Sequence, residues 1–164
     1  DENIAIGYAA LDAQQTGGQN IAIGANALGA EASGNYNTAI GREALKTQNG
    51  ASHNTAIGRT AGMLITTGVQ NTLIGGLAGD ALTDDHDTTA VGYEALGAAT
   101  VGGNTAVGSE ALQNNTSGNS NVAVGIQAGR FVTNADGATF VGKPDSNAQQ
   151  ICKQRLGLGN LILN

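Results

Sequence analysis

Residues 104–120 read Asn-Thr-Ala-Val-Gly-Ser-Glu-Ala-Leu-Gln-Asn-Asn-Thr-Ser-Gly-Asn-Ser, and Asn121 begins the same pattern again. The first nine of these residues follow a signature, Asn-Thr-Ala-Ile-Gly-x-x-Ala-Leu, that recurs along the chain every 17 residues, with one step of 16. The copies begin at Asn3, Asn20, Asn37, Asn54, Asn71, Thr88, Asn104, Asn121 and Ala138. A short repeat of nearly constant period predicts a solenoid, in which each copy forms one coil of a stack.

Three positions of the repeat, counted from 1 at the start of each copy, are expected to be structural. Position 1 is asparagine in Asn20, Asn37, Asn54, Asn71, Asn104 and Asn121. Position 4 is β-branched in Ile6, Ile23, Ile40, Ile57, Ile74, Val91, Val107 and Val124. Position 5 is glycine in Gly7, Gly24, Gly41, Gly58, Gly75, Gly92, Gly108 and Gly125. Stacked asparagine amides are expected to hydrogen-bond from coil to coil.

The alternation within positions 1 to 5 predicts a short β-strand in every copy. Positions 2 and 4, such as Thr38 and Ile40, then point to one side of the strand. Alanine at position 3 points to the other side, so another part of the molecule must approach that side closely. Glycine at position 5 permits a bend or a close backbone contact. We expect an all-β parallel β-solenoid of nine coils with layered Ile, Val and Leu, roughly 40 Å long at about 4.8 Å per coil.

An exchange between two positions indicates a packed interior. Position 9 is leucine in most copies but glycine in Gly62, Gly79 and Gly129. In those same copies, position 12 is a large apolar residue, namely Ile65, Leu82 and Val132. Because an empty leucine-sized void costs about 2–5 kcal/mol, we infer that both positions fill one pocket of the coil.

The composition excludes several classes of protein. Aromatic residues make up 3% and charged residues 12% of the chain, which suits a thin layered core better than a globular one. The net charge of −6 argues against nucleic-acid binding, and no stretch approaches the roughly 18 apolar residues of a membrane helix. A lone cysteine, Cys152, rules out an intrachain disulfide; we expect a free thiol there rather than a bond between chains.

The signature resembles two related kinds of fibrous repeat. It is similar to 17-residue repeats of tail-fibre proteins from phages and prophage-like loci, which read much like residues 104–120. It also resembles the Ser-Val-Ala-Ile-Gly-x-x-Ala core of trimeric autotransporter adhesin heads, whose period is shorter. The resemblance covers residues 3 to about 142 and implies a left-handed parallel β-roll that trimerises side by side. The face of alanine and glycine would offer a flat surface for this association.

The repeat ends near residue 142, which predicts a solenoid over residues 1–142 and a cap or connector over residues 143–164. Pro144 lacks a backbone donor and suits the end of a stack. The apolar residues 156–163 could form a strand, which we expect to pack against neighbouring chains.

Few residues could carry chemistry. His53 and the Asp84–Asp87 stretch with His86 fall in turns, where a solvated loop is expected rather than a metal site. Glu43, Glu94 and Glu110 share position 7, and stacked surface carboxylates are expected there rather than a glycosidase pair. Tyr8, Tyr36 and Tyr93 are dispersed. The sequence therefore predicts no enzyme, and no catalytic, cofactor or metal site.

These observations favour a structural or adhesive role. We expect a stiff spacer in a trimeric tail-fibre-like protein, with variable positions 10 to 17 presented to a host-surface glycan or protein. We expect the protein on a virion tail fibre or at the extracellular cell surface. We expect it to associate first with further copies of itself, as a homotrimer. The alternatives are a bacterial adhesin head, a polysaccharide-cleaving tailspike and an ice-binding solenoid. The run Thr38, Thr55 and Thr72 suggests the last, although position 2 is expected to be mostly buried or at an interface.

Overall fold

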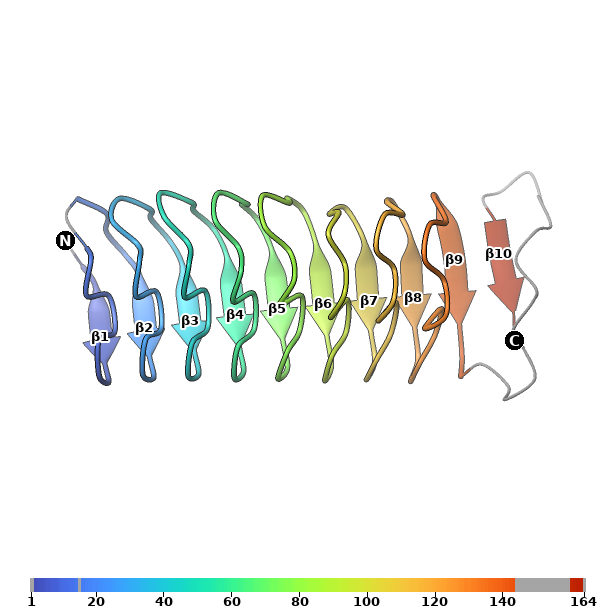
Figure 1. Ribbon diagram of the computed structural model, residues 1–164, viewed down its shortest axis with the longest axis horizontal. Helices are drawn as coiled ribbons and strands as arrows, with labels where there is room; N and C mark the ends of the chain where they lie inside the picture. Colours follow the sequence, from blue (N-terminus) through green and yellow to red (C-terminus); the bar gives the residue numbers. More distant parts are fainter. Residues whose placement is uncertain (1, 15, 144–159, 164) are drawn as a thin grey trace.

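The computed structural model describes residues 2–14, 16–143 and 160–163, and these residues contain strands and turns but no helix (Figure 1). The strands form one parallel sheet in the order β1 to β10, so that each strand pairs with the next along the chain. Their bounds are β1 (Ile4–Ile6), β2 (Ile21–Ile23), β3 (Thr38–Ile40), β4 (Thr55–Ile57), β5 (Thr72–Ile74), β6 (Thr89–Val91), β7 (Thr105–Val107), β8 (Val122–Val124), β9 (Ala138–Val141) and β10 (Asn160–Leu163).

The fold is a parallel β-solenoid, as the repeat predicts. Each of β1 to β9 lies at the same place in its copy, and equivalent residues pair directly, as in Thr38 with Thr55 and Ile40 with Ile57. The shortened sixth copy keeps this register, because Thr89 still pairs with Thr105. The ninth copy is described only through its strand and the two residues after it, so the described solenoid has about eight turns rather than nine coils.

The face of the sheet that carries the position-3 alanines points into the coil. This corrects the prediction that layers of isoleucine and valine form the core. Ala39 and the other position-3 alanines of β2 to β8 are fully buried, as is Leu73. Ile6 at position 4 is instead 58% exposed and Val124 is 43% exposed. The connecting segment returns close behind the strand and places Ala44 and Leu45 in the same interior. Where position 9 is leucine, only a small side chain fits at position 3. The predicted Ile and Val layers lie outside, whereas the leucines of position 9 are inside.

The predicted exchange between positions 9 and 12 is confirmed, and position 3 also takes part in it. A Cβ built on Gly62 would lie 2.6 Å from Leu73 Cδ1 and 3.2 Å from Ile65 Cδ1. One built on Gly79 would lie 2.8 Å from both Leu73 and Leu82 side-chain atoms. Leucine at position 3 therefore occupies space that two neighbouring position-9 glycines leave free. Three positions of the repeat share one interior volume.

The position-1 asparagines connect the coils through the backbone. Asn54 Oδ1 accepts a hydrogen bond from the Asn71 backbone N–H (2.9 Å), and Asn54 Nδ2 donates to the carbonyl of Gly68 (2.7 Å). The same two bonds recur at Asn3, Asn20, Asn37, Asn71, Asn104 and Asn121. The ladder bonds predicted between amides are present only from Asn121 Nδ2 to Asn104 Oδ1 (3.1 Å) among the described asparagines. Each buried amide thus satisfies backbone groups of its own coil and of the next.

Glycine is required at position 5 because the coils touch there. Gly75 has a φ of +134°, and a Cβ on it would lie 2.3 Å from the carbonyl oxygen of Gly92. The predicted close backbone contact is therefore confirmed. Positions 7 and 9 also adopt left-handed backbone conformations, although most of them are not glycine; Leu45 has a φ of +48° and the β-branched Thr60 a φ of +57°. Such residues are uncommon and usually occur singly, whereas here they recur in every turn.

The last strand, β10, pairs in parallel with β9 and places Asn160 beside Ala138. A strand near the C-terminus is thus confirmed over residues 160–163, and its pairing partner in the described structure belongs to the same chain. Pro144, Cys152 and residues 156–159 lie outside the described residues.

Candidate functional site

The outer face of the sheet is a regular surface that follows the whole stack of strands. We define the outer sheet face as the position-2 and position-4 side chains of β1 to β9. Position 2 holds threonine on five consecutive strands, Thr38, Thr55, Thr72, Thr89 and Thr105, all partly exposed. The run is therefore longer than the three threonines first noted, and it is not buried within the chain. Position 4 holds isoleucine or valine throughout, next to the threonine column.

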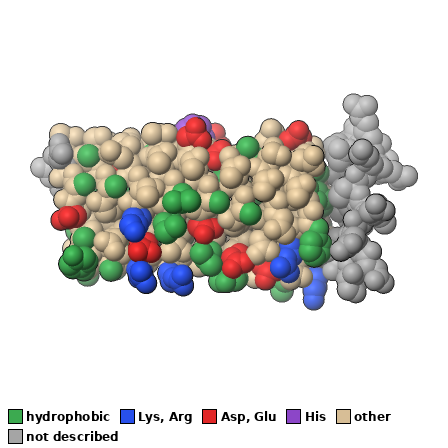
Figure 2. Space-filling view, in the orientation of Figure 1, with side chains coloured by type: hydrophobic (Ala, Val, Ile, Leu, Met, Phe, Trp, Pro, Cys, Tyr) green, Lys and Arg blue, Asp and Glu red, His purple; other side chains and the backbone are tan. Residues whose placement is uncertain are grey.

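This face is uncharged along its whole length in β1 to β9, where only threonine, isoleucine and valine occupy it. Ile57, Val107, Val122 and Val124 each expose more than a third of their surface. Strands about 4.8 Å apart make the face roughly 40 Å long. An exposed apolar patch of this extent usually marks an interaction surface. In Figure 2, many of the Lys, Arg, Asp and Glu side chains lie along one long edge of the rod.

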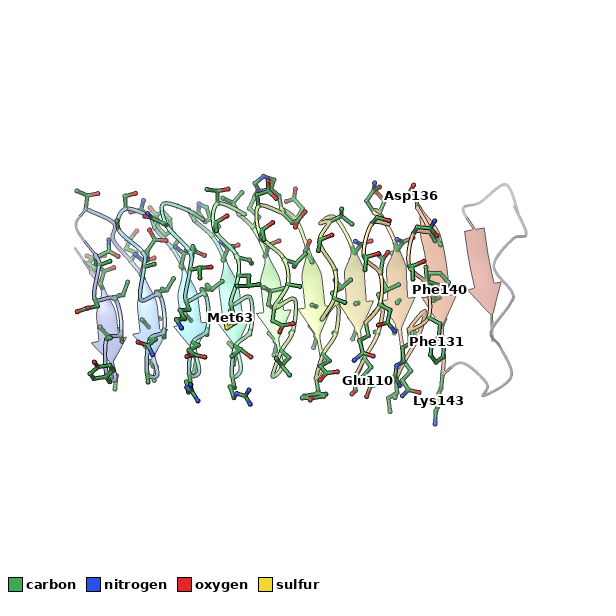
Figure 3. The ribbon with its side chains drawn as sticks, in the orientation of Figure 1. Met63, Glu110, Phe131, Asp136, Phe140 and Lys143 are labelled. Carbon is green, nitrogen blue, oxygen red and sulfur yellow. The ribbon has the colours of Figure 1, made fainter. Side chains whose placement is uncertain are left out.

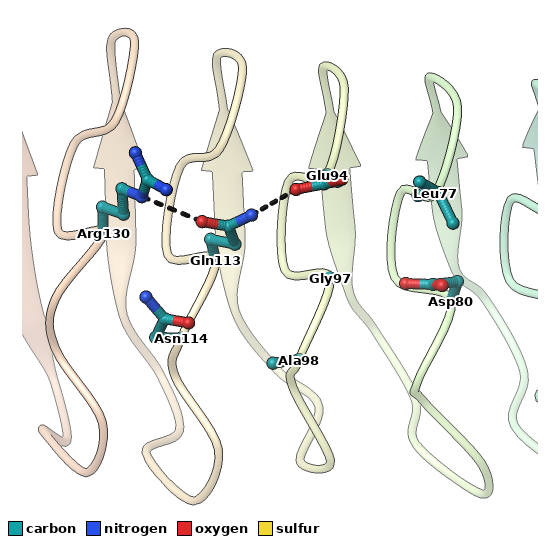
Figure 4. Close-up of a pocket in the computed structure, with 8 residues that line it drawn as sticks. All are labelled: Leu77, Asp80, Glu94, Gly97, Ala98, Gln113, Asn114 and Arg130. Carbon is teal, nitrogen blue, oxygen red and sulfur yellow. Dashed lines mark hydrogen bonds between the residues drawn. The ribbon is translucent and has the colours of Figure 1, made fainter.

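A groove of about 320 Å³ lies in the connecting segments, away from the sheet strands (Figure 4). It crosses four successive turns and uses positions 7, 10 and 11 of the repeat. Its lining residues are Leu77, Asp80, Glu94, Gly97, Ala98, Gln113, Asn114 and Arg130.

Hydrogen bonds order one wall of this groove. Gln113 Nε2 donates to Glu94 Oε2, and Arg130 Nε donates to Gln113 Oε1 (2.9 Å). Arg130 also forms an ion pair with Glu110 Oε2 (2.6 Å). Burial raises the pKa of Asp80 above its ordinary value, and the charge of Glu94 raises it further. The groove is therefore polar and partly preorganised.

The position-7 glutamates are held by different partners. Glu110, labelled in Figure 3, accepts a hydrogen bond from Gln127 Nε2 (2.9 Å) in addition to its ion pair with Arg130. Glu43 forms ion pairs with Arg42 (3.2 Å) and Lys46 (3.4 Å). These are contacts typical of a polar surface, and the prediction of a non-catalytic role for the glutamates stays a prediction.

The two histidines lie in turns, as expected. His53 stacks on Tyr36 with ring centroids 4.9 Å apart and an interplanar angle of 8°. His86 Nδ1 accepts a hydrogen bond from the Val69 backbone N–H (3.0 Å). Burial raises the pKa of Asp85 beside it. Among residues 2–14, 16–143 and 160–163, no group of three or more His, Cys, Asp or Glu side chains could hold a metal ion.

A buried polar network at position 12 was not predicted. Glu31 is fully buried, and its Oε1 accepts hydrogen bonds from the backbone N–H groups of Gly34 (2.6 Å) and Gly50 (2.7 Å). Gln48 is equally buried; it donates to Glu31 Oε2 (2.8 Å) and accepts from Asn54 Nδ2 (2.8 Å). The burial of these side chains could have been inferred from their repeat position, because position 12 is interior in the copies that carry Ile65 or Leu82.

Comparisons with protein-family models, with curated proteins and with solved structures found no match to this chain. Within the described part of the chain, none of the backbone forms a helix that could cross a membrane.

Proposed function

We propose that this chain is a non-catalytic structural segment of a trimeric, tail-fibre-like protein. In this role three solenoids lie side by side and form a stiff spacer on a virion tail fibre or cell surface. The observation that carries the proposal is the outer sheet face, which is long, regular, uncharged and exposed in the single chain. The similarity of the repeats to tail-fibre repeats supports the same role, including a left-handed roll.

Association through the outer sheet face has a physical advantage. A thin solenoid buries mostly alanine and one larger side chain per layer, so a single chain gains little hydrophobic stabilisation. Packing the isoleucines and valines of position 4 against neighbouring chains would remove them from water, at about 25 cal/mol per Å². This face replaces the alanine face as the proposed surface of association, because the alanines are inside the coil.

The stiffness of the spacer follows from bonds between adjacent coils. Backbone pairing along the sheet, the asparagine ladder and the stacked leucines all join each turn to the next. Bending the rod would break these bonds in several layers at once. The more variable connecting segments remain outside, where weak contacts with a receptor can add up over three chains.

The mass of the protein in solution tests this proposal. Light scattering should give the mass of three chains for the wild type. Ile57→Lys combined with Val107→Lys should give single chains with an unchanged circular dichroism spectrum, because both side chains are exposed in the isolated solenoid. Leu64→Lys is the matched control; Leu64 is also exposed but lies outside the sheet, and its replacement should leave the trimer intact. A wild type that is monomeric would contradict the proposal.

One observation favours a second function. The threonine column of β3 to β7 is partly exposed on a regular parallel sheet, an arrangement that could bind ice. A monomeric wild type that lowers the freezing point of ice-containing solutions would support this alternative, whereas a trimer that buries the column would exclude it. A bacterial adhesin head would share the proposed architecture and differ only in what it binds.

A further inference from the structure

The groove lies where the sixth turn has a glycine at position 10 between larger side chains of the two neighbouring turns. Position 10 is Gly97, between Asp80 on the preceding turn and Gln113 on the next (Figure 4). Position 11 is Ala98, beside Asn114. The absence of a side chain at Gly97 leaves a hollow between Asp80 and Gln113. Its width over four turns is about 14 Å at the spacing of stacked strands.

The polar groups of the groove are of two kinds. Glu94, Gln113 and Arg130 are held in place by their mutual hydrogen bonds. The carboxylate of Asp80 accepts a hydrogen bond from its own backbone N–H, and its remaining acceptor sites line the hollow together with the amide of Asn114. Free acceptors and donors beside fixed ones can bind vicinal hydroxyl groups, and Leu77 adds an apolar surface for the C–H groups of a ring.

The charge of the groove further restricts the class of ligand that it can bind. Arg130 is neutralised by Glu110, with which it forms an ion pair. Asp80 and Glu94 therefore leave an excess of negative charge, which repels an acidic ligand. Two carboxylates also provide too few ligands for a dedicated metal site.

We propose that this groove binds a saccharide segment that carries no negative charge, either neutral or amino-bearing. The inference depends on the proposed function, because a fibre segment exposed to surface glycans is where such weak binding would be useful. It adds a ligand class and a location to the general expectation of receptor contacts in the connecting segments. Repetition over three chains would raise the avidity of a weak site.

Gly97→Gln provides a selective test. A Cβ on Gly97 would meet only ordinary or slightly tight contacts, 3.3 Å to Glu94 O and 3.6 Å to Asp80 Oδ1. Its backbone has no left-handed strain, so the variant should fold with its side chain in the groove. Gly29→Gln is the matched control, since Gly29 holds the same repeat position in the second turn and its nearest contacts are 3.4 and 3.5 Å.

The wild type and both variants should be titrated with a neutral glucose oligomer, a glucosamine oligomer and an oligogalacturonate, followed by saturation-transfer NMR and calorimetry. We expect binding of at least one of the first two and weaker or no binding of the acidic oligomer. Gly97→Gln should raise the Kd by about tenfold or more, because losing one or two hydrogen bonds to charged groups costs that much. Gly29→Gln should leave the Kd unchanged.

Three results would overturn the inference: no binding of the neutral or amino oligomers, a preference for the acidic oligomer, or equal effects of the two glutamine variants. Light scattering of the same samples separates this inference from the proposed function. A trimer without saccharide binding would refute the groove alone. A monomer that binds the saccharide through Gly97 would refute the trimeric spacer and leave the groove as a site.

Discussion

Leu73 occupies the space that a side chain at Gly62 would need, since a Cβ on Gly62 would lie 2.6 Å from Leu73 Cδ1. The two residues belong to adjacent turns and to different positions of the repeat. Interior volume is therefore shared between turns, and a large residue at position 3 requires small ones at position 9. This relationship makes the effects of substitutions at the two sites dependent on each other.

The first prediction concerns this pair. Leu73→Ala should lower the free energy of unfolding by about 2–5 kcal/mol, because it leaves a cavity in the core. Gly62→Ala should also be destabilising, because its methyl group overlaps Leu73, at a cost of about 1–3 kcal/mol. In the double variant the overlap disappears, so chemical denaturation should show a favourable coupling of about 1 kcal/mol. Additive effects of the two substitutions would contradict shared volume.

The second prediction concerns the buried carboxylate. Glu31→Ala removes the acceptor of the Gly34 and Gly50 backbone N–H groups. Each buried donor left without a partner costs about 1–3 kcal/mol, so thermal unfolding should occur at a markedly lower temperature. Asp12→Ala serves as the control at an exposed site and should change the stability by less than about 0.5 kcal/mol. Equal stability of the two variants would show that the buried network contributes little.

A third prediction compares two members of the position-1 column. Asn54→Ala removes bonds to Asn71 N, Gly68 O and Gln48 Oε1, and should cost about 2 kcal/mol or more. The Thr88 hydroxyl makes longer bonds, donating to His86 O (3.3 Å) and accepting from Gly103 N (3.1 Å). Thr88→Ala should therefore cost less than Asn54→Ala in urea denaturation. A larger loss of stability for Thr88→Ala than for Asn54→Ala would show that the asparagine hydrogen bonds contribute less to stability than proposed.

The fourth prediction concerns pH. An unfolded aspartate has a pKa of about 3.9, and the pKa of Asp80 is raised in the folded chain by burial and by Glu94. Asp80 therefore stabilises the fold fully below about pH 3.9, and this contribution is lost as the pH rises through the folded-state pKa. Asp80→Asn stays neutral at every pH. Between about pH 4 and neutral pH, the free energy of unfolding of Asp80→Asn should therefore rise relative to that of the wild type. A difference that is independent of pH would contradict the raised pKa.

Much of the architecture could be predicted from residue spacing. The exchange between Gly79 and Leu82 identified a common pocket, and the asparagine column identified contacts between coils. The groove could not be predicted in the same way, because it depends on Gly97 lying between the larger Asp80 and Gln113 in space. The glutamates were recognised as surface residues, but their partners Gln113 and Arg130 come from later turns, and only the stacking brings them together.

The sequence by itself determined the parallel register and the stacking of equivalent residues. A constant period leaves identical side chains one above the other, and β1 to β9 can pair in the same way at every turn. Only the tertiary structure decided which face of the strand is the core. A three-residue strand offers two faces, and hydrophobicity alone favours isoleucine and valine inside. The left-handed residues at positions 7 and 9, which include Leu45 and Thr60, bring the returning chain close to the strand. Position 3 is therefore alanine wherever position 9 is leucine, and the larger Leu73 fits beside position-9 glycines. The larger β-branched residues are therefore left outside, where they form the surface on which the proposed function depends.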